Sequence, residues 1–448
     1  MVNPYLEGNF APVLEERTDE HDLETTGVVP PDLEGRLLRN GPNPVSVPAD
    51  PTDYHWFLGD GMVHAVGLAH GRATGYRNRW VRTRKLAGQV ATVPPKGPHE
   101  PIDGPANTHV IRHGGTTLAL VESGLPHALS PGLDRARVHD FDGSLSSPMC
   151  AHPKVDPDTG ELVFFGVDPF GPPFLRYHVA DRAGELTSTV EVAVPRATMM
   201  HDFGLTSTRA VFLDQPVVFD LALAAEGRAL PFRWMPEVGS HLGVLPRDGD
   251  GDSVRWVSMD PSYVFHVVNA YDDGDRTVLD VIRYDAAFET GPGEAVTACA
   301  ASLARWTVDP AAGRVHEERI DDTPVEFPRI DPVVAGRRHR YAYTVQAGPD
   351  PRHPSYEALL KYDLVRDEAV RFDPGAHRFP GEPVFVRAGD GAGEDEGWVL
   401  SVVYDATRGA SDLVILDATS FAGPPVAVVY LPARVPFGFH GSWIPSDS

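Results

Sequence analysis

The chain has 448 residues, a formal net charge of −24 at pH 7 and 42% apolar residues. This length allows a large core and exceeds the roughly 100–200 residues of a usual domain, although closed all-β folds are an exception. Phosphate binding needs clustered lysines and arginines, so the acidic balance excludes nucleic acid as an expected partner.

The N-terminal segment lacks the basic stretch and apolar core of a signal peptide, so we expect none. No apolar run approaches the roughly 20 residues of a membrane-spanning helix. The two cysteines, Cys150 and Cys299, belong to no CxxC pair, which argues against a disulfide framework. We therefore expect a cytoplasmic protein, and we leave contact with a membrane surface open.

Short runs rich in β-branched and aromatic residues recur along the chain, each after a turn signal. In chain order they are Gly160–Asp168, Arg209–Asp220, Thr277–Asp285, Gly397–Asp405 and Ser411–Ala418. Gly and Pro, with 43 residues each, are spread over the whole chain. This pattern favours strands joined by tight turns. The best helix candidate lies in Val217–Trp234 and ends at Gly227.

No low-complexity linker divides the chain, and residues 389–397 are interpreted as a solvated loop. Many antiparallel strands without a linker favour one closed all-β structure, and a β-propeller of about four to eight blades fits the length. We expect residues 1–448 to form a single propeller domain with cap elements inserted between strands. A protein of two β-sandwiches is the competing architecture. In a propeller the first and last segments often meet, which would hold the C-terminal segment in place.

Four of the 19 histidines, His152, His201, His266 and His440, are flanked by apolar or small residues and adjoin predicted strands. For any one of them, a core histidine bonded to a carbonyl is the simplest interpretation. Their separations of 49, 65 and 174 residues are too large for a local zinc motif. They could meet only where distant strands converge, as at a propeller axis. The histidines predicted to lie at the surface are His70, His178, His316, His353 and His377.

Four neutral imidazoles suit a borderline metal such as iron, zinc or copper. A closed tetrahedral zinc site would be structural. An octahedral metal with the same ligands would keep positions open for oxygen or substrate. Spacing alone leaves both alternatives open.

Motifs that span the chain carry a resemblance to a known family. They include NPYLEGNFAPV, LRNGPNP, YHWFLGDGMVHAV, NTHV, AHPKVDPDTGEL, MMHDFGLT, FHVVNAYDD, EFPRIDP, GEPVFV and FGFHGSW. In this order the chain resembles the carotenoid cleavage oxygenases, which also include stilbene-cleaving and retinoid-isomerising members. The resemblance implies a seven-bladed β-propeller with a small helical or loop cap. It also implies one non-haem Fe(2+) per chain, held on the axis by His152, His201, His266 and His440.

The resemblance further implies three glutamates that receive the far N–H groups of ligand histidines. Glu122 would pair with His201, Glu326 with His266 and Glu382 with His440, and His152 would have no such partner. Such carboxylates fix the tautomer, raise ligand basicity and offset metal charge. The alternative is ordinary surface glutamates, although each stands beside an apolar residue, in turn Val121, Phe327 and Val384.

Three further positions match the family. Thr108 corresponds to a threonine whose methyl group crowds one metal position, although a plain strand threonine is the alternative. Phe57 and Phe265 correspond to aromatic residues that line the substrate tunnel, and core packing is an equally simple account of both.

The resemblance implies a dioxygenase that inserts O2 into a C=C bond of a lipophilic alkene and yields two carbonyl products. The stilbene-cleaving branch typically carries a lysine immediately before the first glutamate, where this chain has Val121. We therefore expect a carotenoid or apocarotenoid substrate with Val121 at the substrate, and a stilbene-type alkene as the alternative. Other hypotheses are a non-catalytic ligand-binding propeller and an isomerase using the same iron.

Residues Leu221–Ser240 fall where the family has an apolar surface patch near the tunnel entrance. In this chain the stretch also contains Glu226, Arg228 and Arg233, so we expect peripheral membrane contact at most. Nothing in the sequence indicates a protein partner.

Overall fold

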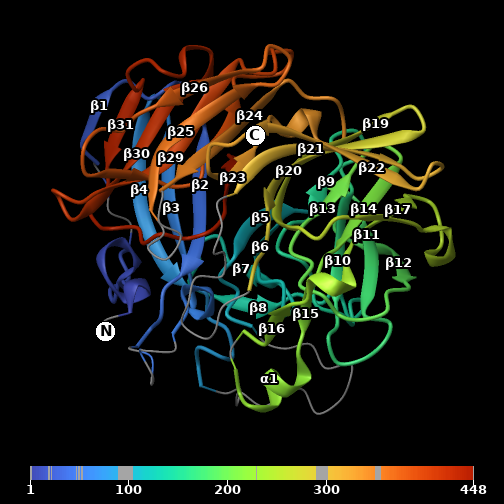
Figure 1. Cartoon of the computed structure of the whole chain (residues 1–448). Helices are drawn as coiled ribbons and strands as arrows, with labels where there is room; N and C mark the ends of the chain where they lie inside the picture. The colour runs from blue at the N-terminus through green and yellow to red at the C-terminus, as the bar shows by residue number, and fades with distance from the viewer. Residues whose placement is uncertain are drawn as a thin grey trace.

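The computed structural model describes the chain except for residues 1, 2, 19, 20, 22, 47, 49, 50, 52, 53, 89–103, 229, 289–300, 349–354, 447 and 448. Within the described residues, the strands form seven sheets of four or six strands and one two-stranded ribbon. The sheets are arranged as the blades of a propeller (Figure 1). The expected all-β fold, a seven-bladed β-propeller, is therefore confirmed.

Each blade is an antiparallel sheet. Blade 1 contains β2 (Gly35–Pro42), β3 (Gly61–Ala69), β4 (Arg72–Trp80) and the C-terminal β32 (Gly441–Pro445). Blade 2 contains β5 (His109–His113), β6 (Thr116–Leu120), β7 (His127–Leu129) and β8 (Ala136–Val138). Blade 3 contains β9 (Lys154–Val155), β10 (Leu162–Val167), β11 (Leu175–Ala180) and β12 (Leu186–Val192). Blade 4 contains β13 (Phe203–Leu205), β14 (Arg209–Asp214), β17 (Ser240–Pro246) and β18 (Arg255–Met259).

The remaining blades follow in chain order. Blade 5 contains β19 (Tyr263–Asp273), β20 (Arg276–Tyr284), β21 (Ser302–Asp309) and β22 (Arg314–Asp321). Blade 6 contains β23 (Val325–Arg329), β24 (Tyr341–Ala347), β25 (Tyr356–Asp363) and β26 (Glu368–Phe372). Blade 7 contains β27 (Arg378–Pro380), β28 (Val384–Arg387), β29 (Gly397–Asp405), β30 (Ala410–Asp417), β31 (Ala427–Tyr430) and the N-terminal β1 (Thr25–Gly27). All five strand regions expected from the sequence contain strands.

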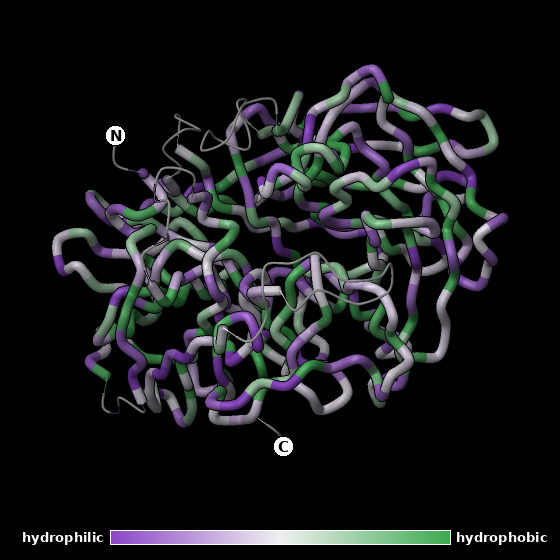
Figure 2. The backbone as a smooth tube through the Cα atoms, turned by 90° about the horizontal axis from the view of Figure 1, so that it is seen from below, coloured by the Kyte–Doolittle hydropathy of each residue, from purple (hydrophilic) through white to green (hydrophobic). Residues whose placement is uncertain are grey.

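Burial explains why the predicted strands read as nearly continuous apolar runs. Five of the six residues of β10 are buried, as are the first nine residues of β19. A strand that is covered on both faces has no solvent-facing side, so apolar and polar residues do not alternate along it. The outermost strand β22 is half-buried or exposed throughout, and it is rich in charged residues. Figure 2 accordingly shows hydrophilic residues at several of the outermost turns.

The two ends of the chain close the ring. β32 pairs antiparallel with β2, from Gly35 with Pro445 to Arg39 with Gly441, while β1 pairs with β31. The glycine before this strand allows a close crossing, because a Cβ on Gly438 would lie 2.9 Å from the Asn40 carbonyl oxygen. The C-terminal segment is thus an integral strand of blade 1.

The helix in the expected segment is shorter than predicted. α1 covers Leu221–Ala225, and the Asp220 side chain accepts hydrogen bonds from two of its first amides. The chain leaves the helix through Gly227 at φ +80°, but Phe232–Trp234 form β16, which pairs with β15 (Val217–Phe219). The region is therefore a helix at the tip of a β-ribbon. Short 3-10 turns are η1 (Pro4–Leu6), η2 (Gly8–Phe10), η3 (Trp56–Leu58), η4 (Pro236–Val238), η5 (Gly251–Ser253), η6 (Pro332–Val334) and η7 (Ala418–Ser420).

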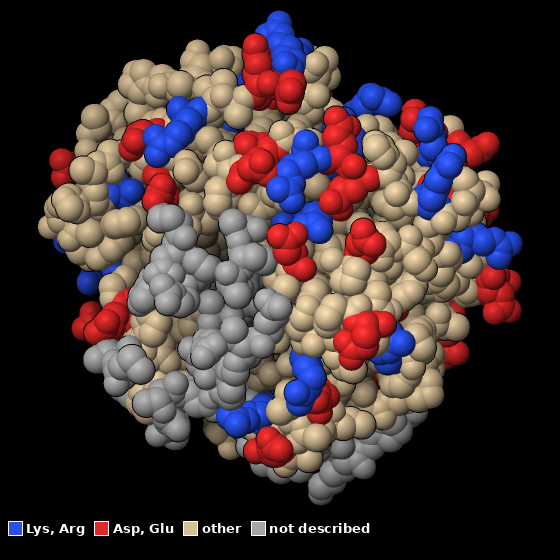
Figure 3. All heavy atoms as spheres, in the orientation of Figure 1, with Lys and Arg blue, Asp and Glu red and all other residues tan. Residues whose placement is uncertain are grey.

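The surface charge is mixed, and the helices are short. On the face drawn in Figure 3, acidic and basic side chains are interspersed. Within the described ranges, no helix is both long and apolar enough to cross a membrane.

One surface prediction is wrong. His178 is only 1% exposed, and its ring forms hydrogen bonds with the Ser147 and Thr189 hydroxyls. His70, His316 and His377 are exposed as expected, and His353 lies outside the described residues.

Candidate metal centre

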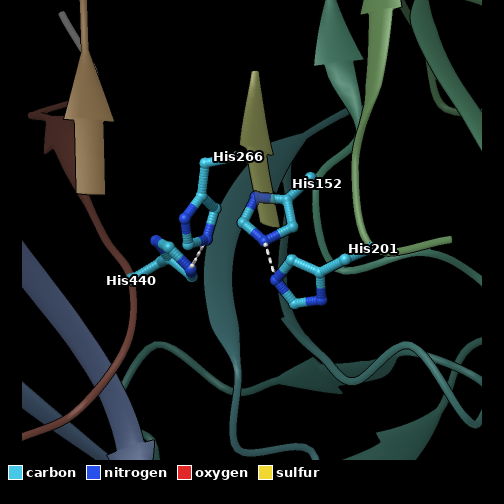
Figure 4. Close-up of side chains that lie close together, drawn as sticks. All are labelled: His152, His201, His266 and His440. Carbon is cyan, nitrogen blue, oxygen red and sulfur yellow. Dashed lines mark hydrogen bonds between the residues drawn. The ribbon is translucent and has the colours of Figure 1, made fainter. Parts of the chain in front are cut away.

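The four histidines singled out from the sequence meet in space, although they come from four parts of the chain (Figure 4). His152, His201 and His440 stand just before β9, β13 and β32, and His266 lies in β19. One nitrogen from each ring lies within 4.8 Å of the others. Each histidine is supplied by a different blade, so the group sits where blades 1, 3, 4 and 5 converge.

The Nε2 atoms of the four rings face one another. The Nε2 atoms of His152 and His201 are 3.0 Å apart, and those of His266 and His440 are 3.2 Å apart. Nitrogens bound to one metal at about 2.1 Å lie about 3–4 Å apart, so this spacing suits a shared ion.

Three carboxylates contact the opposite sides of these rings. Glu122 Oε2 lies 2.5 Å from His201 Nδ1, and Glu382 Oε1 lies 2.7 Å from His440 Nδ1. Glu326 Oε2 contacts His266 Nδ1. These are the pairs that the resemblance implies. In the described part of the chain, no carboxylate contacts His152.

Glu326 and Glu382 are anchored by further donors. The Tyr284 hydroxyl donates to Glu326 Oε1 at 2.6 Å, and the Phe327 amide donates to Oε2 at 2.8 Å. Although burial alone would raise the pKa of Glu326, these donors and His266 lower it below its ordinary value. The carboxylate is therefore ionised and accepts a hydrogen bond from the Nδ1–H group of His266.

Glu382 is held more tightly. Arg329 Nε donates to its Oε1 at 2.9 Å, and the Gly441 amide donates to its Oε2 at 2.7 Å. Burial opposes the charge, but Arg329 and His440 hold the pKa of Glu382 well below its ordinary value. Arg329 also donates to the Gly441 carbonyl at 2.5 Å. Both the amide and the carbonyl of Gly441, the residue after His440, are therefore hydrogen-bonded.

These contacts define the proton positions and test whether the site fits a metal. The carboxylates of Glu326 and Glu382 only accept, so His266 and His440 carry their protons on Nδ1. Both facing Nε2 atoms are then lone-pair acceptors 3.2 Å apart. Burial and neighbouring groups hold the pKa of His440 well below its ordinary value, which disfavours a second proton on its ring. A cation bound between the two Nε2 atoms would satisfy both lone pairs, so the residues present fit a metal ion.

The pKa of His201 shifts in the opposite direction to that of His440. Burial alone would lower its pKa, but the Glu122 carboxylate raises the pKa of His201 above its ordinary value. His152 has no such partner, and burial together with the other three histidines holds its pKa well below the ordinary value.

Aromatic rings surround the histidines. The Phe265 ring centroid lies 5.4 Å from that of His201, and Phe57, in η3, lies 6.4 Å from Phe265. Phe439, which precedes the ligand candidate His440, lies 5.5 Å from Phe57. The two aromatic residues expected from the sequence are thus joined to the histidine cluster through ring contacts.

Thr108 and Val121 are also buried close to this region. The Thr108 carbonyl accepts from the His440 amide at 3.0 Å, and its hydroxyl donates to Asn107 Oδ1 at 3.0 Å. Val121 is 7% exposed and directly precedes Glu122. Contact of these two residues with substrate stays a prediction.

Several residues of the centre were not singled out from the sequence. Tyr284, Arg329 and Phe327 contact the glutamates or histidines, and Phe327 has a φ of +52° where it turns beside His440. Arg329 and Phe327 lie inside the quoted EFPRIDP motif. The motif pointed to the region, but only the packing reveals which side chains reach the glutamates.

Comparisons with known proteins agree with this geometry. Residues 10–445 match the family model described as retinal pigment epithelial membrane protein. The carotenoid cleavage oxygenase of Mycobacterium tuberculosis is 38% identical over 501 aligned residues, which cover 99% of this chain and 98% of that protein.

Solved structures agree as well. The lignostilbene dioxygenase of Pseudomonas brassicacearum superposes with a TM-score of 0.90 at 29% identity, covering 99% of this chain and 98% of that one. The cobalt-substituted apocarotenoid oxygenase of Synechocystis gives a TM-score of 0.86 at 28% identity, covering 97% of each chain. The chain belongs to the carotenoid cleavage oxygenase family.

Proposed function

We propose that this protein is a non-haem Fe(2+)-dependent dioxygenase that cleaves a C=C bond of a carotenoid or apocarotenoid into two carbonyl products. One Fe(2+) per chain would be held by His152, His201, His266 and His440. The observation that carries the proposal is the convergence of the four histidine rings, with one nitrogen of each within 4.8 Å of the others. The names of relatives, a carotenoid cleavage oxygenase and an apocarotenoid oxygenase, support the class of substrate.

Each polar residue of the centre has a defined task in this proposal. The histidines hold the ion through Nε2, while Glu122, Glu326 and Glu382 keep the proton on Nδ1 and offset part of the charge of the ion. Fe(2+) bound there would supply the activation of O2 beside the alkene. No side chain has to act as a nucleophile or acid in cleaving the C=C bond.

The aromatic residues would receive the substrate. Phe57 and Phe265 offer apolar surface next to the histidines and exclude water from the reacting bond. Val121 adds no charge that could bind a phenolate. The Thr108 hydroxyl is occupied by Asn107, which leaves the methyl group to limit the space around the ion.

A stilbene-type alkene is the second candidate, because the lignostilbene dioxygenase shares the fold at a TM-score of 0.90. Phenolic substrates need a polar partner for their hydroxyl group, and Val121 does not provide one. We therefore place this substrate class second.

Peripheral membrane contact is a further part of the proposal. Leu221, at the start of α1, is 66% exposed, and the neighbouring Glu226 and Arg228 are exposed as well. This mixed surface suits shallow contact that lets a lipophilic substrate enter. Binding of the wild type and of Leu221→Ser to lipid vesicles tests it, and equal binding by both would contradict it. The cytoplasmic location and the single-domain organisation stay predictions.

A panel of substrates tests the proposed reaction. The iron-loaded protein is incubated separately with β-carotene, an apocarotenal and resveratrol, and the products are identified by mass spectrometry. We expect two carbonyl fragments from a carotenoid or apocarotenoid and little turnover of resveratrol. Fragments from resveratrol alone would establish the second candidate, and a product of unchanged mass would establish isomerisation instead.

A further inference from the structure

A buried ion pair lies directly beside the histidine cluster. Lys154 Nζ lies 2.7 Å from Asp202 Oδ1, and the side chains are 24% and 2% exposed. Lys154 is the second residue after His152, and Asp202 is the residue after His201. The pair therefore joins the segments that present two of the histidines.

The same carboxylate reaches a third segment. Asp202 Oδ2 accepts a hydrogen bond from the Val267 amide at 2.8 Å, and Val267 directly follows His266. Asp202 Oδ1 also accepts from the Phe203 amide at 2.8 Å, which fixes the start of β13. One buried side chain thus contacts blades 3, 4 and 5 next to His152, His201 and His266.

His440 is held by a separate set of contacts. Its amide donates to the Thr108 carbonyl at 3.0 Å, and the Asn40 amide donates to its carbonyl at 3.0 Å. Glu382 and Arg329 fix the residue after it. The centre therefore has two supports, one for three histidines and one for the fourth.

We propose that Asp202, held in place by Lys154, is a positioning residue that sets the spacing of His152, His201 and His266. The inference rests on the proposed function, because it treats these histidines as metal ligands. Among the described residues, Asp202 makes no hydrogen bond to a ligand ring, so it acts on the metal through the backbone positions that it fixes. A buried carboxylate that bridges three segments constrains them far more than a backbone contact between neighbours does.

The chain offers a matched control. Arg305 and Asp280 in blade 5 form a bidentate ion pair at 2.7 and 2.8 Å, with side chains 24% and 0% exposed. Asp280→Asn therefore breaks a pair of similar burial whose carboxylate lies beside His339 and makes no hydrogen bond to the residues next to His152, His201 or His266. Asp202→Asn and Asp280→Asn should lower the thermal stability of the metal-free protein by similar amounts.

Co(2+) binding separates the two variants, because it does not depend on turnover. We expect Asp202→Asn to weaken Co(2+) binding by about 10–100-fold and to change the visible absorption of the bound ion, since misplaced ligands alter both. Asp280→Asn should bind Co(2+) like the wild type. Equal affinity and an unchanged spectrum in Asp202→Asn would overturn the proposal.

A second pair of variants covers the case in which Asp202→Asn does not fold. Lys154→Met keeps the length of the side chain and removes its charge, and Lys154→Arg restores the charge. We expect the Met variant to weaken Co(2+) binding about tenfold and the Arg variant to recover most of it. Wild-type affinity in Lys154→Met would contradict the inference.

The wild type separates failure of this inference from failure of the proposed function. A wild type that binds metal but cleaves no alkene refutes the proposed reaction, while the Co(2+) comparison still decides the role of Asp202. A wild type that binds neither Fe(2+) nor Co(2+) overturns both.

Discussion

At the scale of single residues, the proton positions on the histidines depend on three carboxylates that are held in different ways. Glu382 receives Arg329 and the Gly441 amide in addition to His440, and its side chain is 1% exposed. Glu122 is 29% exposed, and a neutral amide in its place could rotate to accept from His201. The two glutamates should therefore differ in how well the centre tolerates their replacement.

We predict that Glu382→Gln weakens metal binding more than Glu122→Gln. At position 382, the NH2 group of glutamine would face one of the donors that now contact the carboxylate, namely Arg329, His440 or the Gly441 amide. Glu122→Gln loses charge but can keep its hydrogen bond. Losses of about 10–100-fold are typical for such partners, and Glu382→Gln should lie at the upper end. Competition with a chelator measures both affinities. Equal losses in the two variants would contradict the prediction.

Val121 tests the choice of substrate. We predict that Val121→Lys raises kcat/KM for resveratrol relative to an apocarotenal at least tenfold, because an ammonium group can bind a phenol and its burial disfavours an apolar polyene. Val121→Met, which is long but uncharged, is the control. An unchanged substrate ratio in the lysine variant would mean that Val121 does not face the substrate.

Because of two buried histidines away from the cluster, we predict that the free energy of unfolding falls in acid. Burial lowers the pKa of His64 and of His178, each to about 3, against about 6.5 in the unfolded chain. Between these values only the unfolded state binds the proton, so stability is present at neutral pH and falls with pH. From pH 7 to pH 5.5 each histidine should cost about 1 kcal/mol of unfolding free energy.

The variant His178→Gln measures this share. The amide can bond to the Ser147 and Thr189 hydroxyls but does not titrate. The free energy of unfolding, measured by urea denaturation, should therefore fall between pH 7 and pH 5.5 by about 1 kcal/mol less in this variant than in the wild type. The same drop in His178→Gln and wild type would refute the assignment.

At the scale of elements, β32 combines closure of the ring with support of a metal ligand. The strand completes blade 1 by pairing with β2, and its Ile444 is buried at 3% exposure. His440 stands immediately before it. Loss of the strand and loss of the imidazole should therefore have separable effects.

We predict that His440→Ala abolishes stable metal binding while the metal-free protein keeps its melting temperature to within a few degrees. Removal of residues 441–448 should cost the metal-free protein at least about 3 kcal/mol, because burial of Ile444 and the ladder with β2 are lost. Calorimetry of the metal-free proteins and metal analysis distinguish the two effects. A truncated chain as stable as the wild type would contradict the role of β32 in closure.

The elements also show what could be predicted from the sequence. Strands such as β20 and β29 were predictable because apolar runs stand between clear turn signals. The place of α1 and its end near Gly227 were predictable as well, but its short length was not, because Val217–Phe219 pairs with Phe232–Trp234 and this pairing overrides local helix propensity. His178 was wrongly placed at the surface because its hydroxyl partners come from β12 and from residue 147, which is distant in the chain.

At the scale of the whole molecule, the propeller explains how His152 and His440, 288 positions apart in the chain, reach one site. The histidines and their glutamates could be found through the resemblance, since the motifs mark their positions. Asp202, Lys154 and Arg329 could not, because their importance depends on which blade lies beside which. Their sequence neighbours give no sign that one carboxylate contacts three blades.

We propose that the four-histidine centre adds both atoms of O2 across a C=C bond. The most direct test is turnover of an apocarotenal by the iron-loaded protein under oxygen-18 gas, with rapid trapping of the products and the metal-free protein as control. We expect two carbonyl products with one oxygen-18 atom each, formed only when iron is present. Label in a single product, or an isomer of unchanged mass, would contradict it.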